Sequence, residues 1–298
     1  MTINEAYQYA KNELKKIYDT QEATNIANLA IEKISGLKRT SRILNKNQVL
    51  TIEQANDLHK YLEQLSNHKP VQYVLNEAWF AAMKFYVDEN VLIPRPETEE
   101  LVDWIVQDAK VSIQNSNINL SLNTILSSQN ILDIGTGSGC IAIALKKKMN
   151  AEISAIDVSE AALKIASFNA QQNNTAISFF KADILQNEIN IRPSLFDVIV
   201  SNPPYITNKE SAEMNKNVIA HEPHIALFVP DEDPLLFYDA ISNFALSHLK
   251  QNGKLFFEIH EHFGNEVVTH LKQKGFISVE LKKDLQQKNR MVKAVLSK

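Results

Sequence analysis

The chain has 298 residues, a length that predicts two domains or one large domain with an appendage. Hydrophobic residues make up 44% and charged residues 22%, which is typical of globular proteins and excludes collagen-like and low-complexity classes. The net charge of −4 gives no overall basic field, so we expect no stable binding to nucleic acid.

Other global features point to a protein of a reducing, aqueous compartment. The single cysteine, Cys140, excludes an internal disulfide. No apolar run reaches the ~18 residues of a membrane span, and the N-terminal stretch lacks the apolar core of a signal peptide. We therefore expect a cytoplasmic monomer that makes no membrane contact.

Residues 1–68 predict a small helical bundle. Apolar positions such as Leu58, Leu62 and Leu65 recur at helical spacing. Thr51 stands three residues before a glutamine, the spacing of a capping box. The bundle is a candidate for substrate recognition.

Residues 69–110 predict a linker that contains a hairpin and a helix. The stretch 71–91 is rich in aromatic and β-branched residues, which favours extended structure. Pro96 suits the first position of a helix, and the acidic residues behind it suit the positive end of the helix dipole. Residues 111–130 carry no charge and predict a connection.

Short apolar runs alternate with helical segments in the rest of the chain. Continuous apolar strands are typical of a mostly parallel sheet that helices cover on both faces, so the fold class is α/β. Such sheets bind ligands at the carboxyl ends of their strands. The predicted strands are 130–134, 153–157, 177–180, 196–201 and 254–259, and the predicted helices lie near 139–148, 159–172 and 234–250.

A glycine-rich turn joins the first of these strands to the first helix. Three of the seven glycines of the chain fall within this turn, where they permit positive φ and let a ligand approach the backbone. A dinucleotide fingerprint starting at the first glycine fails at Cys140, although a degenerate pattern starting two residues later is allowed. The turn indicates an adenosine-containing cofactor without deciding which one. Its residues are Gly135, Thr136, Gly137, Ser138 and Gly139.

Two acidic residues follow at the next strand ends. Asp157 closes the second strand, where a carboxylate would accept hydrogen bonds from ribose hydroxyls. Asp183, followed by Ile184, comes after the third strand, where it could meet an adenine amino group. Because the glycine turn and both acids stand in order at successive strand ends, a cofactor site is favoured over isolated helix caps.

The strand 196–201 ends in Asn202, Pro203, Pro204 and Tyr205. The prolines lack N–H donors and have fixed φ angles, so the backbone carbonyls are held rigidly as acceptors. Asn202 adds a side-chain carbonyl and Tyr205 a flat face. This set suits a planar NH2 group whose lone pair faces a methyl sulfonium, where positioning suffices without a strong base.

With these segments in hand, the chain resembles the class I S-adenosylmethionine-dependent methyltransferases that carry Asn-Pro-Pro-Tyr. More narrowly, it is similar to the release-factor glutamine methyltransferases. The resemblance runs from about residue 70 to the C-terminus, and the helical N-terminal region agrees in size and type. The segments that carry it are 92–99 (LIPRPETE), 133–139 (DIGTGSG), 202–205 (NPPY) and 222–227 (EPHIAL).

The resemblance implies a seven-stranded Rossmann-like methyltransferase domain over residues 111–298. It implies S-adenosylmethionine as the cofactor and the glutamine of the Gly-Gly-Gln loop in peptide chain release factors as the substrate. Asn202 would be the catalytic residue, and Asn202 to Tyr205 would hold the glutamine amide. The implied cofactor-binding residues are Gly135, Thr136, Gly137, Ser138, Gly139, Asp157, Asp183, Ile184 and Asn202.

Arg95 has two interpretations. It could bind an anionic or carbonyl group of the substrate, or form a salt bridge to Glu97 or Glu99. His260 and His262 have no second cluster of ligands, so we expect no metal site. Cys140 is expected to pack beneath the glycine turn rather than to act as a nucleophile.

Three places depart from the family pattern by lacking a glycine that the family usually has, and they are Asn76, the pair Ala81 and Ala82, and His260. They leave loop shape and substrate fit open. Other functions also stay open: methylation of an adenine amine in nucleic acid, methylation of a ribosomal-protein glutamine, a nicotinamide-dependent oxidation, or a non-catalytic binding module. The Arg-Pro-Glu-Thr-Glu segment favours the release-factor substrate over the ribosomal one.

Overall fold

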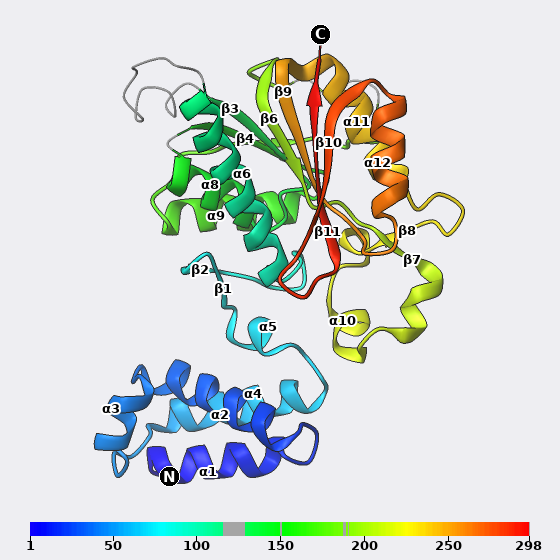
Figure 1. Cartoon of the computed structure of the whole chain (residues 1–298). Helices are drawn as coiled ribbons and strands as arrows, with labels where there is room; N and C mark the ends of the chain where they lie inside the picture. The colour runs from blue at the N-terminus through cyan, green and yellow to red at the C-terminus, as the bar shows by residue number, and fades with distance from the viewer. Residues whose placement is uncertain (116–128, 150, 187–188, 190, 298) are drawn as a thin grey trace. The chain divides into compact units, whose positions relative to one another are not determined.

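The computed structural model describes residues 1–115, 129–149, 151–186, 189 and 191–297 (Figure 1). The chain forms two compact units, one of Met1–Glu77 with Asn215–His221 and one of Ala78–Met214 with Glu222–Lys298. The domain boundaries expected from the sequence, at residues 68 and 110, stay predictions. None of the helices that the structure describes combines the length and hydrophobicity needed to span a bilayer.

The first unit is helical, as predicted. Its core contains the fully buried Leu14, Ile31, Leu58 and Leu65, which come from three helices. Thr51 forms the predicted capping box at the start of one of them. The helices are α1 (Ile3–Leu14), α2 (Thr20–Ser35), α3 (Arg39–Leu44), α4 (Ile52–Ser66), α5 (Val71–Leu75) and α10 (Lys216–His221).

The extended structure predicted from residue 71 is wrong for α5. This short helix follows Pro70 and buries Tyr73, Val74 and Leu75. Val74 and Leu75 join the core of the first unit, so tertiary burial outweighs the strand preference of the local sequence. The predicted hairpin is present just beyond, as β1 (Ala78–Phe80) and β2 (Met83–Phe85).

The second unit contains a seven-stranded sheet in the order β10-β11-β9-β6-β3-β4-β5. β11 pairs antiparallel with both of its neighbours, and the remaining pairs are parallel, which confirms the predicted α/β fold. The strands are β3 (Asn130–Ile134), β4 (Glu152–Asp157), β5 (Ser178–Lys181), β6 (Phe196–Ser201), β9 (Leu249–Glu258), β10 (Phe276–Lys283) and β11 (Asn289–Leu296).

Helices cover both faces of this sheet (Figure 1). One face carries α6 (Pro96–Asn115), α8 (Cys140–Met149) and α9 (Glu160–Gln172), and the other carries α11 (Leu236–His248) and α12 (Gly264–Gln273). Shorter elements complete the unit: β7 (Ile206–Thr207), η1 (Asn208–Glu213), η2 (His224–Ala226) and β8 (Phe228–Val229).

α6 begins at Pro96 as predicted but extends to Asn115, so the connection expected over 111–130 is wrong for residues 111–115. Buried Leu101, Val102 and Ile105 anchor the helix in the unit. Once an amphipathic helix is anchored, each further residue adds a backbone hydrogen bond, so an uncharged polar continuation can stay helical. Residues 116–128 lie outside the described part of the chain.

Strand order determines where a ligand can bind. β3 has β4 on one side and β6 on the other, so the chain connections leave in opposite directions from the centre of the sheet. A crevice forms at this point beyond the carboxyl ends of parallel strands. The glycine turn, Asp157 and Asn202 follow β3, β4 and β6 at this edge.

Asn76, Ala81 and Ala82, which stand at two of the places where a glycine was expected, have a glycine-like backbone, whereas His260 does not. Asn76 ends α5 with φ 49°, and Ala81 and Ala82 form the β1–β2 turn with φ 49° and 60°. All three lie in the left-handed region, which is costly for a residue with a Cβ atom. These three residues therefore carry a cost in backbone strain that glycine would not.

We predict that Ala82→Gly stabilises the protein. Ala82 is exposed and has φ 60°, so glycine relieves strain without removing a packed side chain, and we expect about 1 kcal/mol in the free energy of unfolding. Denaturant unfolding measures this change. Ala240→Gly, in the middle of α11, is the matched control and should destabilise by about 1 kcal/mol. An equal loss of unfolding free energy in both variants would contradict backbone strain at Ala82.

Candidate active site

A cavity of about 250 Å³ lies at the carboxyl ends of β3, β4 and β6. Its walls bring together most of the residues predicted from the sequence to form the site. Gly139 and Tyr205 are the two predicted residues that do not line it. Those that do are Arg95, Gly135, Thr136, Gly137, Ser138, Asp157, Asp183, Ile184, Asn202, Pro203 and Pro204.

The glycine turn is tied to the neighbouring strand. The backbone N–H groups of Gly135 and Thr136 donate to the carbonyl of Ile156, at 2.9 and 3.0 Å. Gly135 and Gly137 have φ of 71° and 53°, and a Cβ atom on either would meet no protein atom within 4 Å. Both glycines line the cavity, so side chains there would intrude on space that a ligand can use.

Gly139 serves a different purpose from the one expected. A Cβ atom here would lie 3.2 Å from the Cβ of Ala166 on α9, and φ is 83°. Its lack of a side chain is therefore required by the close packing of two helices rather than by space for a ligand. Gly135 and Gly137 line the cavity, where contact with the cofactor stays a prediction, whereas a Cβ atom on Gly139 would point at α9 and not into the cavity.

Asp157 braces the glycine turn from the end of β4. One carboxylate oxygen accepts the N–H of Gly137 and the other accepts the N–H of Ser159, each at 2.9 Å. Burial raises the pKa of Asp157, and the backbone hydrogen bonds oppose that rise. Because a carboxylate oxygen can accept more than one hydrogen bond, Asp157 retains the capacity to accept ribose hydroxyls.

Asp183 and Ile184 form the wall beyond β5. The Asp183 carboxylate accepts the N–H of Leu185 at 3.0 Å, which holds a tight turn against the cavity. The cavity thus combines the exposed backbone of the glycine turn, the carboxylate of Asp157 beside that turn, and the carboxylate of Asp183 next to the apolar Ile184. This donor and acceptor set fits S-adenosylmethionine, whose ribose and adenine would face Asp157 and Asp183.

Arg95 forms a salt bridge, but with neither of the expected partners. Its guanidinium lies 2.6 Å from the carboxylate of Glu222, whose side chain is 1% exposed. The other oxygen of Glu222 accepts the N–H of Ile93 at 3.4 Å. The pairing with Glu97 or Glu99 is therefore wrong, because the chain fold brings the buried Glu222 to Arg95 from 127 positions away. Substrate binding by Arg95 stays a prediction.

Two residues that the sequence analysis did not single out hold the Asn-Pro-Pro-Tyr segment. The Asn202 side-chain N–H donates to the hydroxyl oxygen of Thr98 at 3.3 Å, and the Tyr205 hydroxyl donates to Glu258 at 3.1 Å. Thr98 also donates to Glu258, at 2.6 Å. The one available signal was an acidic residue, Glu258, directly after the apolar residues 255–257 at the end of β9.

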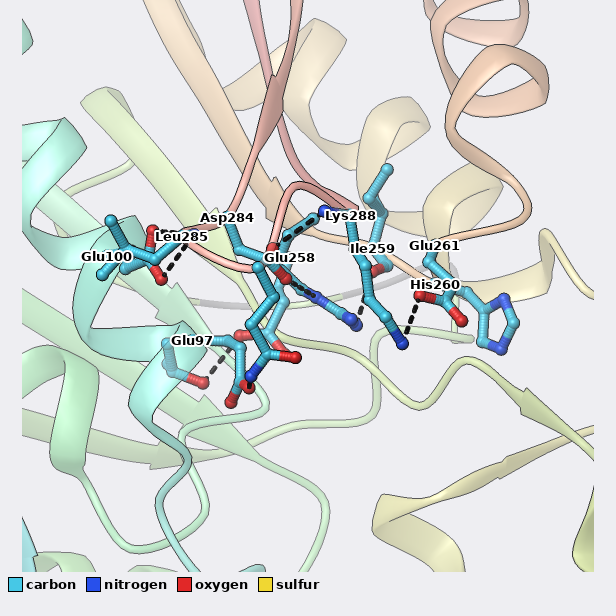
Figure 2. A network of polar contacts seen from close by, with 12 residues as sticks. Glu97, Glu100, Glu258, Ile259, His260, Glu261, Asp284, Leu285 and Lys288 are labelled. Carbon is cyan, nitrogen blue, oxygen red and sulfur yellow. Dashed lines mark hydrogen bonds and ion pairs between the residues drawn. The ribbon is translucent and has the colours of Figure 1, made fainter. Parts of the chain in front are cut away.

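The turn between β10 and β11 contacts both α6, which carries Thr98, and the segment just beyond β9, which carries Glu258 (Figure 2). The N–H of Leu285 donates to the carboxylate of Glu100 on α6, at 3.2 Å to each oxygen. On the other side, the Lys288 ammonium lies 2.9 Å from Glu261, just beyond β9. The start of α6 and the end of β9 are thus tied to one turn.

Cys140 and His260 are the remaining candidates. Burial raises the pKa of the Cys140 thiol to about 12, which keeps it protonated, and Cys140 lies at the wall of the cavity. His260 lies 3.0 Å from Glu210, and burial lowers the pKa of that histidine. Within the described ranges of the chain, no group of three or more histidine, cysteine or acidic residues could hold a metal ion.

Asp133 lies beneath the glycine turn and is fully buried. Its carboxyl group accepts the hydroxyl of Thr136 at 2.6 Å. Burial raises its pKa to about 7, and the nearby charge of Asp157 adds to the rise. The folded protein therefore binds a proton at Asp133 more tightly than the unfolded chain does.

We predict that Asp133→Asn becomes progressively less destabilising, or more stabilising, as pH rises. The folded pKa near 7 exceeds the ordinary 3.8, so Asp133 favours folding at low pH and that contribution is lost between about pH 4 and 7. The variant has no such proton. The unfolding free energy of Asp133→Asn minus that of the wild type should therefore rise by up to ~1.4 kcal/mol per pH unit in this window. Denaturant unfolding at several pH values measures it, and a constant difference would contradict the prediction.

Comparisons with known proteins show what this chain is similar to. A family model described as "Methyltransferase small domain" matches residues 116–226, and one described as "PrmC N-terminal domain" matches residues 5–75. Among solved structures, the catalytic domain of hMettl16 has a TM-score of 0.52 and 17% identity, covering 83% of this chain and 82% of that one. This likeness concerns the fold alone.

Two curated relatives are similar along nearly the whole chain. "Release factor glutamine methyltransferase" of Flavobacterium psychrophilum is 45% identical over 282 residues, covering 94% of each chain. The protein of the same name from Bacteroides thetaiotaomicron is 35% identical over 293 residues, covering 98% of this chain and 99% of its own. The chain therefore belongs to the family of release factor glutamine methyltransferases.

Proposed function

We propose that this chain transfers a methyl group from S-adenosylmethionine to the side-chain amide nitrogen, N5, of the glutamine in the Gly-Gly-Gln motif of peptide chain release factors. The observation that carries this proposal is the shared cavity, in which the glycine turn and Asp157 lie with the acceptors of Asn202 and Pro203. The names of the relatives support the choice of substrate.

Different residues of the chain would bind the cofactor and the substrate. Gly135 to Ser138, Asp157 and Asp183 would hold the cofactor, which when bound supplies a methyl group on a positively charged sulfur. The side-chain oxygen of Asn202 and the carbonyl of Pro203 would accept the two amide hydrogens of the glutamine. The prolines keep these acceptors rigid, so little reorganisation is needed during the reaction.

No strong base is required in this scheme. The amide nitrogen, held by Asn202 and Pro203, would receive the methyl group that the cofactor supplies when bound, and one amide proton would then pass to solvent water. Tyr205 does not serve as the base, because burial raises the pKa of its hydroxyl, and that hydroxyl donates a hydrogen bond to Glu258. Catalysis therefore rests on positioning and on the electrostatics of fixed acceptors.

The proposal extends to partners and location. The chain would act as a monomer, and the release factor would be its partner in the cytoplasm, where translation factors work. Stable binding to nucleic acid is not expected, since the net charge is −4. Methylation of an adenine amine is the alternative, because the same acceptors could hold that NH2 group.

A transfer assay tests the substrate. We expect label from methyl-labelled S-adenosylmethionine to appear on a purified release factor, and to be absent when the glutamine of its Gly-Gly-Gln motif is replaced by alanine. Asn202→Ala should abolish labelling, because the substrate amide loses an acceptor. Label on DNA or RNA oligonucleotides, with none on the release factor, would contradict the proposal and favour the adenine alternative.

A binding experiment tests the glycine cradle separately. Gly137→Ala should weaken S-adenosylmethionine binding by about tenfold or more, because its Cβ would occupy space that faces the cavity. Calorimetry measures this affinity. Gly275→Ala is the matched control, since Gly275 also has a positive φ of 91° and open space around it but does not line the cavity. Equal affinity of both variants would contradict the role of Gly137.

A further inference from the structure

One buried carboxylate holds both ends of the Asn-Pro-Pro-Tyr segment. Glu258 is 1% exposed, and its two oxygens accept from different hydroxyl groups. One accepts from Thr98 at 2.6 Å and the other from Tyr205 at 3.1 Å. Thr98 in turn accepts the side-chain N–H of Asn202 at 3.3 Å. The four side chains form one chain of hydrogen bonds.

The charge of Glu258 gives this chain a direction. An ionised carboxylate can only accept hydrogen bonds, so the Thr98 hydroxyl must donate its single hydrogen to Glu258. The Thr98 oxygen is then an acceptor toward Asn202, and the partner it selects is the NH2 side of the Asn202 amide. The opposite branch of that amide, its carbonyl oxygen, is left as the acceptor that Asn202 can offer to the cavity.

We propose that Glu258 and Thr98 are positioning residues, which set the polarity of the Asn202 amide so that its oxygen is presented to the substrate. This inference rests on the proposed function, in which the substrate group is an NH2 with two donor hydrogens. With the Asn202 amide reversed, its NH2 would face the NH2 of the substrate, and two sets of donors would repel each other.

The same carboxylate also orients Tyr205, at the other end of the segment. Because Pro203 and Pro204 are stiff, fixing Asn202 and Tyr205 at both ends leaves the carbonyls between them little freedom. Glu258 therefore controls the acceptor set through two contacts. It does so from β9, whereas Thr98 lies on α6 and Asn202 follows β6.

Several groups surround the Glu258 carboxylate. Burial raises its pKa, while the hydrogen bonds from Thr98 and Tyr205 and the charge of Arg290 lower it, and Glu97 raises it further. The Tyr238 hydroxyl of α11 donates to the backbone carbonyl of Glu258 at 3.4 Å. Protonation would turn the carboxyl group into a donor and allow the chain of hydrogen bonds to reverse.

Thr98 is the position to test first, because two substitutions separate its hydroxyl from its bulk. Thr98→Val keeps the shape but removes the hydroxyl, so the Asn202 amide loses its orientation. We expect kcat with the release factor to fall about tenfold or more, with a smaller change in KM. Thr98→Ser restores the hydroxyl and should recover most of kcat. Equal loss in both variants, or no loss with valine, would overturn the proposal.

Glu258→Gln tests the direction of the hydrogen bonds. Glutamine has one carbonyl oxygen for two hydroxyl donors, so its NH2 must face Thr98 or Tyr205 and oppose one of them. We expect low kcat at all pH values, whereas the wild-type kcat falls as pH drops through the pKa of Glu258. If kcat of Glu258→Gln falls at acidic pH just as wild-type kcat does, the fall does not come from protonation of Glu258. If Glu258→Gln has the same kcat as the wild type, the proposal is overturned.

A measurement without the release factor keeps this inference separate from the proposed function. In protein with isotope-labelled asparagine, the NH2 resonances of Asn202 are identified by their loss in Asn202→Ala. Slow hydrogen exchange of this group in the wild type and in Thr98→Ser, but fast exchange in Thr98→Val, supports the orientation. Fast exchange in the wild type would overturn it. A wild-type protein with protected Asn202 that does not label release factor would contradict only the proposed function.

Discussion

The Glu258 carboxylate lies at the end of a central strand, out of contact with water, and accepts hydrogen bonds from two hydroxyl groups. Burial of a charge costs free energy unless hydrogen bonds or opposite charges compensate it. Here the compensation comes from α6, from the segment after β6 and from Arg290 on β11. The carboxylate therefore joins three parts of the second unit, and the geometry of Asn202 depends on that junction.

The cofactor side of the cavity follows the same physical rule. Asp133 and Asp157 are both carboxyl groups whose pKa is raised by burial, and both are engaged by groups of the glycine turn. Hydrogen bonds from Thr136 and from the N–H of Gly137 offset part of the desolvation cost. The turn is thus held in place before any ligand binds, which reduces the entropy that binding must overcome.

Strain in the β1–β2 turn shows how far local preference can be overruled. Ala81 and Ala82 adopt left-handed backbone angles because the pairing of Phe80 with Met83 leaves two residues for the turn. A two-residue turn of this kind requires positive φ at both positions. Both alanines therefore hold a backbone conformation that glycine adopts at lower cost.

The sequence by itself determined the chemistry of the site and most of the second unit. The glycine turn, Asp157 and Asn202 to Tyr205 could be recognised, and β3 and β6 were predicted to the residue, because the apolar composition of a strand and the composition of a turn are local properties of the sequence. Only the tertiary structure decided that Arg95 pairs with Glu222, that Gly139 accommodates a helix, and that Thr98 and Glu258 meet across 160 positions. These contacts depend on strand order and helix packing, and no local pattern of residue types encodes which distant side chains the fold will bring together.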